Sequence, residues 1–271
     1  MNSFQYHRPE RVKDARQLFE SKEQAAYLAG GHTLLPTMKH GLARPATIID
    51  LGAIPALRGI EAAGGTLAIG AGTCHADVAA SAAVRKFIPA LAGLAGSIGD
   101  RHVRNRGTIG GSLANNDPAA DYPAAVLGLG AIIVTDRREI PAGDFFVALY
   151  ETALELGEII TRVRFPLPHS AGYAKFRSAA SRYPIAGVFI SRSPPGVRVA
   201  VTGAGARGAF RASDLERVLA DDFRAEALAG LSLDPSGLLA DLSGTPEYRA
   251  HLMLVMARRA IENLGSTQSY K

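Results

Sequence analysis

Residues 99–121 constrain this chain more than any other stretch, because they combine many glycines with many polar side chains. The adjacent Gly110 and Gly111 permit backbone conformations closed to other residues and let another group approach the main chain closely. Exposed N–H groups in such a turn form a concave site for an anion such as a pyrophosphate. A Gly-Gly pair alone marks turns in general, but residues 29–33 (AGGHT) repeat this chemistry far away in the sequence. Together the two stretches favour a binding site.

The length and charge of the chain narrow its class. Its 271 residues allow one large domain or two or three smaller ones. Residues 122–135 are too short an uncharged run to span a bilayer, and residues 1–20 lack the apolar segment of a secretory signal. The net charge of +5 is not concentrated in a basic helix with interleaved aromatic residues. We therefore expect a cytoplasmic protein with no membrane insertion and no nucleic-acid partner.

Few residues suggest hydrolytic or metal chemistry. The single cysteine, Cys74, excludes internal disulfides and any cysteine-ligated cluster held by this chain alone. No histidine pair has zinc-binding spacing and no G-x-S-x-G motif is present, so Cys74 is interpreted as a small packed residue and no metal site is expected. Asp117 and Asp121 would share a helix face, but Pro118 makes Asp117 a helix cap rather than half of a carboxylate pair.

The first half of the chain alternates between predicted helices and strands. Residues 12–28 have apolar side chains at a spacing closer to a helix, and the β-branched run 46–50 predicts a strand. With an extended entry at 4–9, these predict a small βαβ unit. Residues 54–60 are expected to form a turn. Further strands are predicted at 65–70, 131–135 and 158–165, and helices at 76–86, 89–98 and 118–128.

The pattern changes near residue 168. Strands are predicted at 173–178, 185–191 and 197–202, and helices at 213–220, 223–228 and 247–263. No helical pattern lies between the strands, which predicts an antiparallel sheet in an α+β unit. The G-x-G-x-x-G sequence at 203–208 follows this meander rather than a parallel strand, so it is interpreted as a loop and not as a dinucleotide fingerprint.

Four motifs carry a resemblance to a known family. They are AGGHTLLP at 29–36, VRNRGTIGGSLANNDPAAD at 103–121, LGEII at 156–160 and RYPIA at 182–186. In this order and spacing the chain resembles, over essentially its whole length, the FAD-binding medium subunits of the molybdenum hydroxylases, which include the xanthine dehydrogenase and carbon monoxide dehydrogenase flavoproteins. The resemblance implies an α+β fold. Residues 1–167 would form a p-cresol methylhydroxylase-type FAD-binding α/β domain with subdomains at about 1–53 and 54–167, and residues 168–271 a smaller C-terminal domain with an antiparallel three-stranded sheet and helices.

The resemblance also implies which residues bind FAD. Two loops would hold the pyrophosphate and adjoining groups through backbone N–H donors: Ala29, Gly30, Gly31, His32, Thr33 and Leu34 in the first, and Thr108, Ile109, Gly110, Gly111 and Ser112 in the second. The remaining implied contacts are Asp121 at the ribityl or ribose hydroxyls, Ile98 near the cofactor, Ile160 at the adenosine half, Lys175 near the flavin ring and Tyr183 over the isoalloxazine. Ser112 stands where the family usually has asparagine, which removes about 0.5–1.5 kcal/mol if one hydrogen bond is lost.

The implied function is electron transfer rather than acid–base catalysis. A large partner subunit would carry the molybdenum cofactor, a small one would carry two [2Fe–2S] clusters, and the assembly would be a dimer of heterotrimers. Arg101, Arg104 and Arg106 would stabilise the FAD phosphates, dock an acidic partner or form loop salt bridges. Two alternatives remain: a free-standing flavin-dependent oxidoreductase, and a non-catalytic nucleotide-binding module. The hydroxylated substrate and the final electron acceptor do not follow from this sequence.

Overall fold

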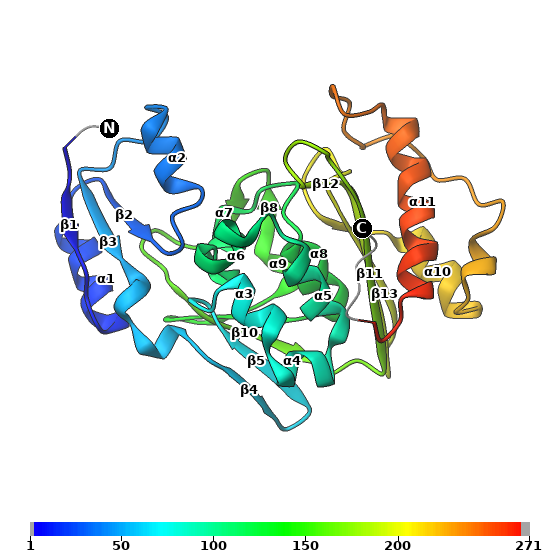
Figure 1. The fold of residues 1–271 in the computed structure, drawn as a ribbon, viewed down its shortest axis with the longest axis horizontal. Helices are drawn as coiled ribbons and strands as arrows, with labels where there is room; N and C mark the ends of the chain where they lie inside the picture. The colour runs from blue at the N-terminus through cyan, green and yellow to red at the C-terminus, as the bar shows by residue number, and fades with distance from the viewer. Residues whose placement is uncertain (1–2, 267–271) are drawn as a thin grey trace.

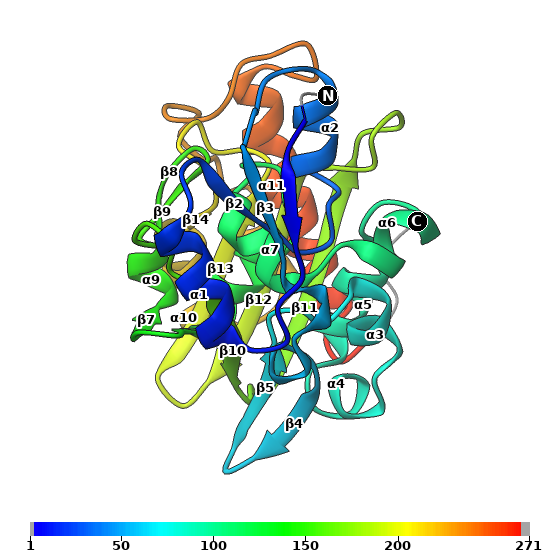
Figure 2. The same ribbon diagram turned by 90° about the vertical axis from the view of Figure 1, so that its left-hand side faces the viewer.

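A small parallel sheet forms the N-terminal part of the molecule. The computed structural model describes residues 3–266. Strands β1 (Gln5–His7), β3 (Thr47–Asp50) and β2 (Ala25–Leu28) lie side by side in that order, and both pairings are parallel. Helix α1 (Val12–Ser21) packs against this sheet, and helix α2 (Leu34–Lys39) follows the loop after β2 (Figures 1 and 2). The predicted βαβ organisation is therefore present.

The single helix expected over residues 12–28 is wrong in its second half. Helix α1 ends at Ser21, Gln24 adopts a left-handed backbone conformation with φ of 48°, and residues 25–28 form β2. A four-residue apolar run cannot be assigned to helix or strand by its periodicity alone. Here its backbone groups pair with β3, a contact that only the tertiary structure supplies.

The centre of the molecule is a five-stranded antiparallel sheet packed against short helices (Figure 1). Its order is β4 (Ile60–Ala63), β5 (Thr66–Gly70), β10 (Ile160–Pro166), β6 (Ile132–Thr135) and β7 (Glu139–Pro141). The helices are α3 (His75–Ala80), α4 (Ala82–Phe87), α5 (Pro89–Ser97), α6 (Arg101–Arg106), α7 (Ile109–Asn115), α8 (Tyr122–Leu129) and α9 (Ala142–Phe145). A small hairpin joins β8 (Phe146–Ala148) to β9 (Glu151–Thr152). Residues 54–60, expected as a turn, contain the 3-10 turn Pro55–Leu57 and the first residue of β4.

The third part is an antiparallel sheet with helices on both faces. The three predicted strands are confirmed as β11 (Ser170–Arg177), β12 (Pro184–Ser193) and β13 (Gly196–Thr202), and the two-residue strand β14 (Phe210–Arg211) adds a fourth. Helices α10 (Ser213–Asp221) and α11 (Pro246–Glu262) cover the outer face (Figure 1). The α+β fold expected from the resemblance is thus confirmed.

Alternation along β12 explains how this sheet joins the rest. Val188 and Ile190 belong to the core beneath α11, whereas Phe189 between them belongs to the central core. Successive side chains of a strand point to opposite faces, so a strand buried on both faces links two cores. A Cβ on Gly128 of α8 would lie 2.9 Å from the ring of Phe189, so glycine allows the helix to approach the sheet this closely.

Residues 203–208 follow β13 of the antiparallel sheet and lead into β14. The interpretation of this G-x-G-x-x-G sequence as a loop is therefore confirmed, because no parallel strand–helix–strand unit surrounds it. Across residues 3–266, no helix combines the length and the apolar character needed to cross a bilayer.

Candidate functional site

The two glycine-rich stretches meet in space. A Cβ placed on Gly30 would collide with the carbonyl oxygen of Arg106 and lie 2.7 Å from the Cα of Gly107. Both atoms are backbone, so no side-chain rotation could make room for it. Glycine at position 30 is therefore required by the close approach of the two loops, which come from segments about 76 residues apart in sequence.

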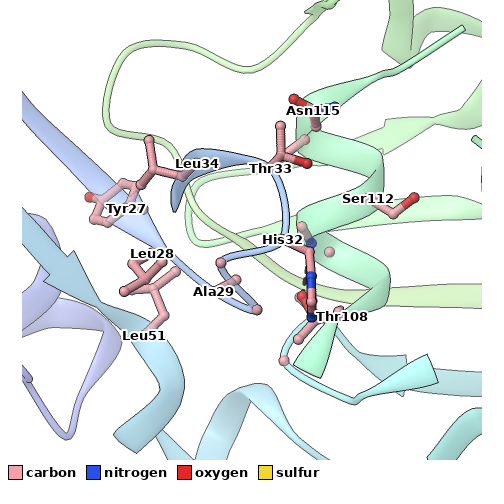
Figure 3. Close-up of a pocket in the computed structure, with 18 of the residues that line it drawn as sticks. Tyr27, Leu28, Ala29, His32, Thr33, Leu34, Leu51, Thr108, Ser112 and Asn115 are labelled. Carbon is pink, nitrogen blue, oxygen red and sulfur yellow. Dashed lines mark hydrogen bonds between the residues drawn. The ribbon is translucent and has the colours of Figure 1, made fainter. Parts of the chain in front are cut away.

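A cavity of about 550 Å³ lies along this contact, within the size range of small-molecule sites. It separates the parallel sheet from the central helices, and Figure 3 shows Ala29 and His32 facing the start of α7. Of the sixteen residues named by the resemblance, fourteen line it: Ala29, Gly30, Gly31, His32, Thr33, Leu34, Ile98, Thr108, Gly110, Gly111, Ser112, Asp121, Ile160 and Tyr183. Ile109 and Lys175 do not line it, because both side chains are buried in the protein behind the cavity wall.

The second stretch is mostly helical rather than the expected loop. Asp100 caps α6 and Thr108 caps α7, each through a side-chain oxygen that accepts a backbone N–H. Gly110 and Gly111 therefore lie in the first turn of a helix. A Cβ on Gly110 would lie 2.5 Å from the Cβ of Ala71, so this glycine is required by packing against the segment after β5 rather than by approach of a ligand.

The segment after β5 and the Thr108 side chain occupy the N–H groups that the resemblance assigned to the pyrophosphate. The N–H of Ile109 and that of Gly110 donate to carbonyl oxygens of residues 71–73, at 3.2 and 2.8 Å. The N–H of Gly111 donates to the Thr108 hydroxyl oxygen at 3.1 Å. The expectation that both loops offer free amides is therefore not met by the second loop. It lines the cavity through the backbone of Gly110 and Gly111 and through the side chains of Ser112 and its neighbours.

The first loop does offer free donors. Within residues 3–266, the backbone N–H groups of residues 30–33 donate to no protein acceptor. Three arginines that also line the cavity, Arg8, Arg58 and Arg106, add positive charge. Free amides and cations are the groups that bind a pyrophosphate. The apolar Leu28 and Leu51 (Figure 3), with Ile159, are suited to contact a flat ring. The residues present therefore fit FAD.

Asp121 and Lys175 form a buried ion pair at the inner wall of the cavity. The Lys175 Nζ lies 2.7 Å from Oδ1 of Asp121 and 3.2 Å from the carbonyl oxygen of Ser97. The Tyr173 hydroxyl donates to the same Asp121 oxygen at 2.7 Å. The Asp121 and Lys175 side chains are only 4% and 2% exposed. The pair therefore fixes the cavity wall to β11. Lys175 binds Asp121 from the side that faces away from the cavity.

The LGEII motif is explained by Glu158, whose side chain organises the neighbouring turns. Burial would raise the pKa of this carboxyl, but hydrogen bonds from Arg138, the Glu155 backbone and Thr135 outweigh that effect and lower it to about 2. The side chain has no exposed area. Glu158 therefore holds residues 135–138 and 153–160 together beside the cavity.

This arrangement predicts a pH dependence of stability. A carboxyl with a depressed pKa stabilises the folded state above its ordinary value of 4.5, and this contribution is lost as the pH falls toward about 2. We expect Glu158→Gln to destabilise the protein at neutral pH and the gap to wild type to close on acidification. Urea unfolding at several pH values measures the free energy of unfolding of the variant and of wild type. Glu61→Gln, at an exposed position, is the control. A gap that is constant with pH would contradict this role.

Several cavity residues were missed by the sequence reasoning. The segment after β5 lines the cavity through Ala71, Gly72, Cys74 and His75, and Asn115 lines it from the end of α7. A third glycine-rich stretch, GAGTCH at 70–75, was the available signal. Burial raises the pKa of the Cys74 thiol, which agrees with a packed residue rather than a nucleophile. Burial also lowers the pKa of His75 to about 4, so it is neutral at physiological pH.

Comparison with known proteins decides the family. Residues 2–168 match the family model for the FAD binding domain in molybdopterin dehydrogenase. The chain is 36% identical to the nicotine 6-hydroxylase medium subunit of Paenarthrobacter nicotinovorans, covering 97% of this chain and 98% of that one. It is 35% identical to the carbon monoxide dehydrogenase medium chain of Hydrogenophaga pseudoflava, covering 95% and 96%. The chain belongs to the family of FAD-binding subunits of molybdenum hydroxylases.

Solved structures agree with this assignment. The fold matches a chain of carbon monoxide dehydrogenase from Hydrogenophaga pseudoflava with a TM-score of 0.82 and 34% identity, covering 96% of both chains. It matches quinoline 2-oxidoreductase from Pseudomonas putida 86 with a TM-score of 0.86 and 27% identity, also covering 96% of both. As a member of this family, the chain is a subunit of an oxidoreductase and FAD is its cofactor. The resemblance inferred from the four motifs is therefore confirmed.

Proposed function

We propose that this chain accepts electrons from [2Fe–2S] clusters of a small partner subunit and passes them through FAD to an external acceptor. A large partner subunit would carry the molybdenum cofactor and the substrate site, and the assembly would be a dimer of heterotrimers. The observation that carries the proposal is the contact of Gly30 with Arg106 and Gly107, which makes one cavity from the two family motifs.

Different residues of the cavity would bind different parts of the cofactor. The free amides of residues 30–33, with the nearby arginines, are suited to the pyrophosphate. Ile160 and its neighbours are assigned to the adenosine half, and Ile98, Asp121 and Tyr183 to the flavin end. FAD, when bound, supplies the exchange between one-electron and two-electron transfer. The protein positions the cofactor and excludes competing reactants.

The single cysteine of the chain supports a partner as the electron donor. Iron–sulfur clusters need thiolate ligands, and Cys74 alone cannot hold one. The clusters that deliver electrons must therefore belong to another chain. Arg101, Arg104 and Arg106 form no ion pair within residues 3–266. Arg104 instead donates to the carbonyl oxygens of Ile98 and Gly99, which supports a structural role for that residue.

A reduction assay separates this proposal from a free-standing flavin enzyme. We expect the purified chain to hold FAD and to leave it oxidised when anaerobic purine, aldehyde or N-heterocyclic substrates are added. The same substrate should bleach the flavin only after the partner subunits are present, because the proposal places the substrate-oxidising centre in the large subunit. Stopped-flow absorbance of the flavin measures both. Rapid reduction of the isolated chain by a small substrate would overturn the proposal in favour of the free-standing enzyme.

A further inference from the structure

A buried histidine without a hydrogen-bond partner lies at the wall of the cavity. His75, the first residue of α3, is 5% exposed and is one of the residues that line the cavity. Within residues 3–266, its Nδ1 is closed to solvent and has no hydrogen-bond partner, and its Nε2 has none either. Buried polar side chains nearly always have a partner, so one left unpaired at a cavity wall points to a ligand.

Backbone pairing with the second loop fixes the place of His75. The N–H of His75 donates to the carbonyl oxygen of Gly107 at 3.0 Å. The residues that precede them and follow them, Cys74 and Thr108, form an antiparallel bridge. The start of α3 is therefore held against the segment that Gly30 contacts.

Two contacts orient the ring of His75. The first is with the fully buried ring of Tyr122, whose centroid lies 5.3 Å away at a tilt of 52°. The second is with Gly107, where a Cβ would lie 2.6 Å from Nε2 and 2.9 Å from Cδ2 of His75. Gly107 also contacts Gly30, so the Nε2 edge of the ring lies at the crossing of the two loops. The free amides of residues 30–33 begin at this crossing.

His75 is suited to donate a single hydrogen bond. Burial, with smaller effects from His32 and Arg104, lowers the pKa of His75 to about 4. The imidazole therefore carries one hydrogen at neutral pH. Placing that hydrogen on Nε2 leaves no unbonded N–H in the interior and presents the donor at the crossing of the loops.

We propose that His75 is a further cofactor-binding residue, which donates its Nε2–H to a phosphate oxygen of the FAD pyrophosphate. The inference rests on the proposed function, because it needs the pyrophosphate at residues 30–33. An anion is the ligand favoured at this crossing, since the neighbouring groups are free amides and the cation of Arg106. The unpaired Nδ1 destabilises the folded chain, and the hydrogen bond from Nε2 to the cofactor explains why a histidine is retained.

Calorimetric titration of the full-length apoprotein with FAD tests this with three variants. His75→Leu fills similar space without a donor, and we expect its dissociation constant to rise about 10-fold or more, because hydrogen bonds to charged groups are strong. His75→Gln brings its amide nitrogen near the position of Nε2 and should keep most of the affinity. His75→Asn reaches only the position of Nδ1 and should not. His251→Leu, exposed on α11, is the control and should match wild type.

Two further measurements separate binding from packing. Because Nδ1 is unpaired in the protein, His75→Leu should leave the melting temperature of the apoprotein unchanged or raise it. Phosphorus-31 NMR of the FAD-loaded chain should show a displaced pyrophosphate resonance in His75→Leu and a resonance close to that of wild type in His75→Gln.

The possible outcomes are separable. An unchanged dissociation constant in His75→Leu would overturn this inference and leave the proposed function intact. Weaker binding with a lower melting temperature and unchanged phosphorus resonances would show a role in packing alone and would also overturn it. Full affinity in His75→Asn with a loss in His75→Gln would overturn it too, because the donor would then lie at Nδ1. A wild-type chain that takes up no FAD would instead overturn the function itself.

Discussion

Gly30→Ala is expected to abolish tight FAD binding while the protein still folds. The new Cβ would collide with the carbonyl oxygen of Arg106 and lie 2.7 Å from the Cα of Gly107. Neither atom can move without displacing the second motif, so the loops must separate. Overpacking of this kind costs about 1–3 kcal/mol, and a comparable loss in binding corresponds to a roughly 5- to 150-fold weaker dissociation constant.

Gly143→Ala is the matched control, because its Cβ would meet no atom within 4 Å and its φ is not positive. The FAD content after purification and a calorimetric titration of the apoprotein measure the effect. The prediction is a large loss for Gly30→Ala and none for Gly143→Ala. Wild-type FAD content and affinity in Gly30→Ala would show that contact between the loops does not shape the cofactor site.

Lys175→Met is expected to give the largest loss of stability among single substitutions near the cavity. It leaves the 4% exposed Asp121 carboxylate without its cation, and the Tyr173 hydroxyl remains as a partner. Removing one member of a buried ion pair costs about 3–5 kcal/mol. For a chain of this size that corresponds to a fall in melting temperature of about 6–20 °C.

The double variant Asp121→Asn with Lys175→Met should be more stable than Lys175→Met alone, because no unpaired charge remains in the interior. Arg217→Ala is the control, since Arg217 and Asp214 form an ion pair whose side chains are 74% and 60% exposed, and its loss should cost less than about 0.5 kcal/mol. Urea unfolding measures all three. A Lys175→Met variant as stable as Arg217→Ala would contradict the structural role of the pair.

The sequence predicted well which residues lie at the site. It predicted less well which role each of these residues has there. The family resemblance identified fourteen residues that line the cavity. The sequence could not reveal why each glycine is needed, because both appear only as glycines in a motif. Gly30 is required by backbone contact with residues 106–107, whereas Gly110 is required by packing on Ala71. Nor could the sequence show that the amides of residues 109–111 are already bonded, since their acceptors come mostly from a separate segment.

The fold, like the site, was predicted from the sequence only where local pattern decides the structure. Strands with clear alternation, such as 160–166, and the C-terminal meander were predicted close to their observed bounds. Strand β2 was missed because its pairing with β3 is decided by tertiary contact rather than by local pattern. Lys175 was assigned to the flavin ring, yet its neighbour across the fold, Asp121, holds it behind the cavity wall. Such long-range pairings are not encoded in local spacing.

Hydrogen–deuterium exchange of the chain with and without FAD tests the central claim most directly. The claim is that the free amides of residues 30–33 hold the pyrophosphate, whereas those of residues 109–111 are already bonded within the protein. We expect FAD to slow exchange strongly in peptides covering residues 30–33 and to change residues 109–111 much less. Protection confined to residues 109–111, with none at residues 30–33, would contradict the account.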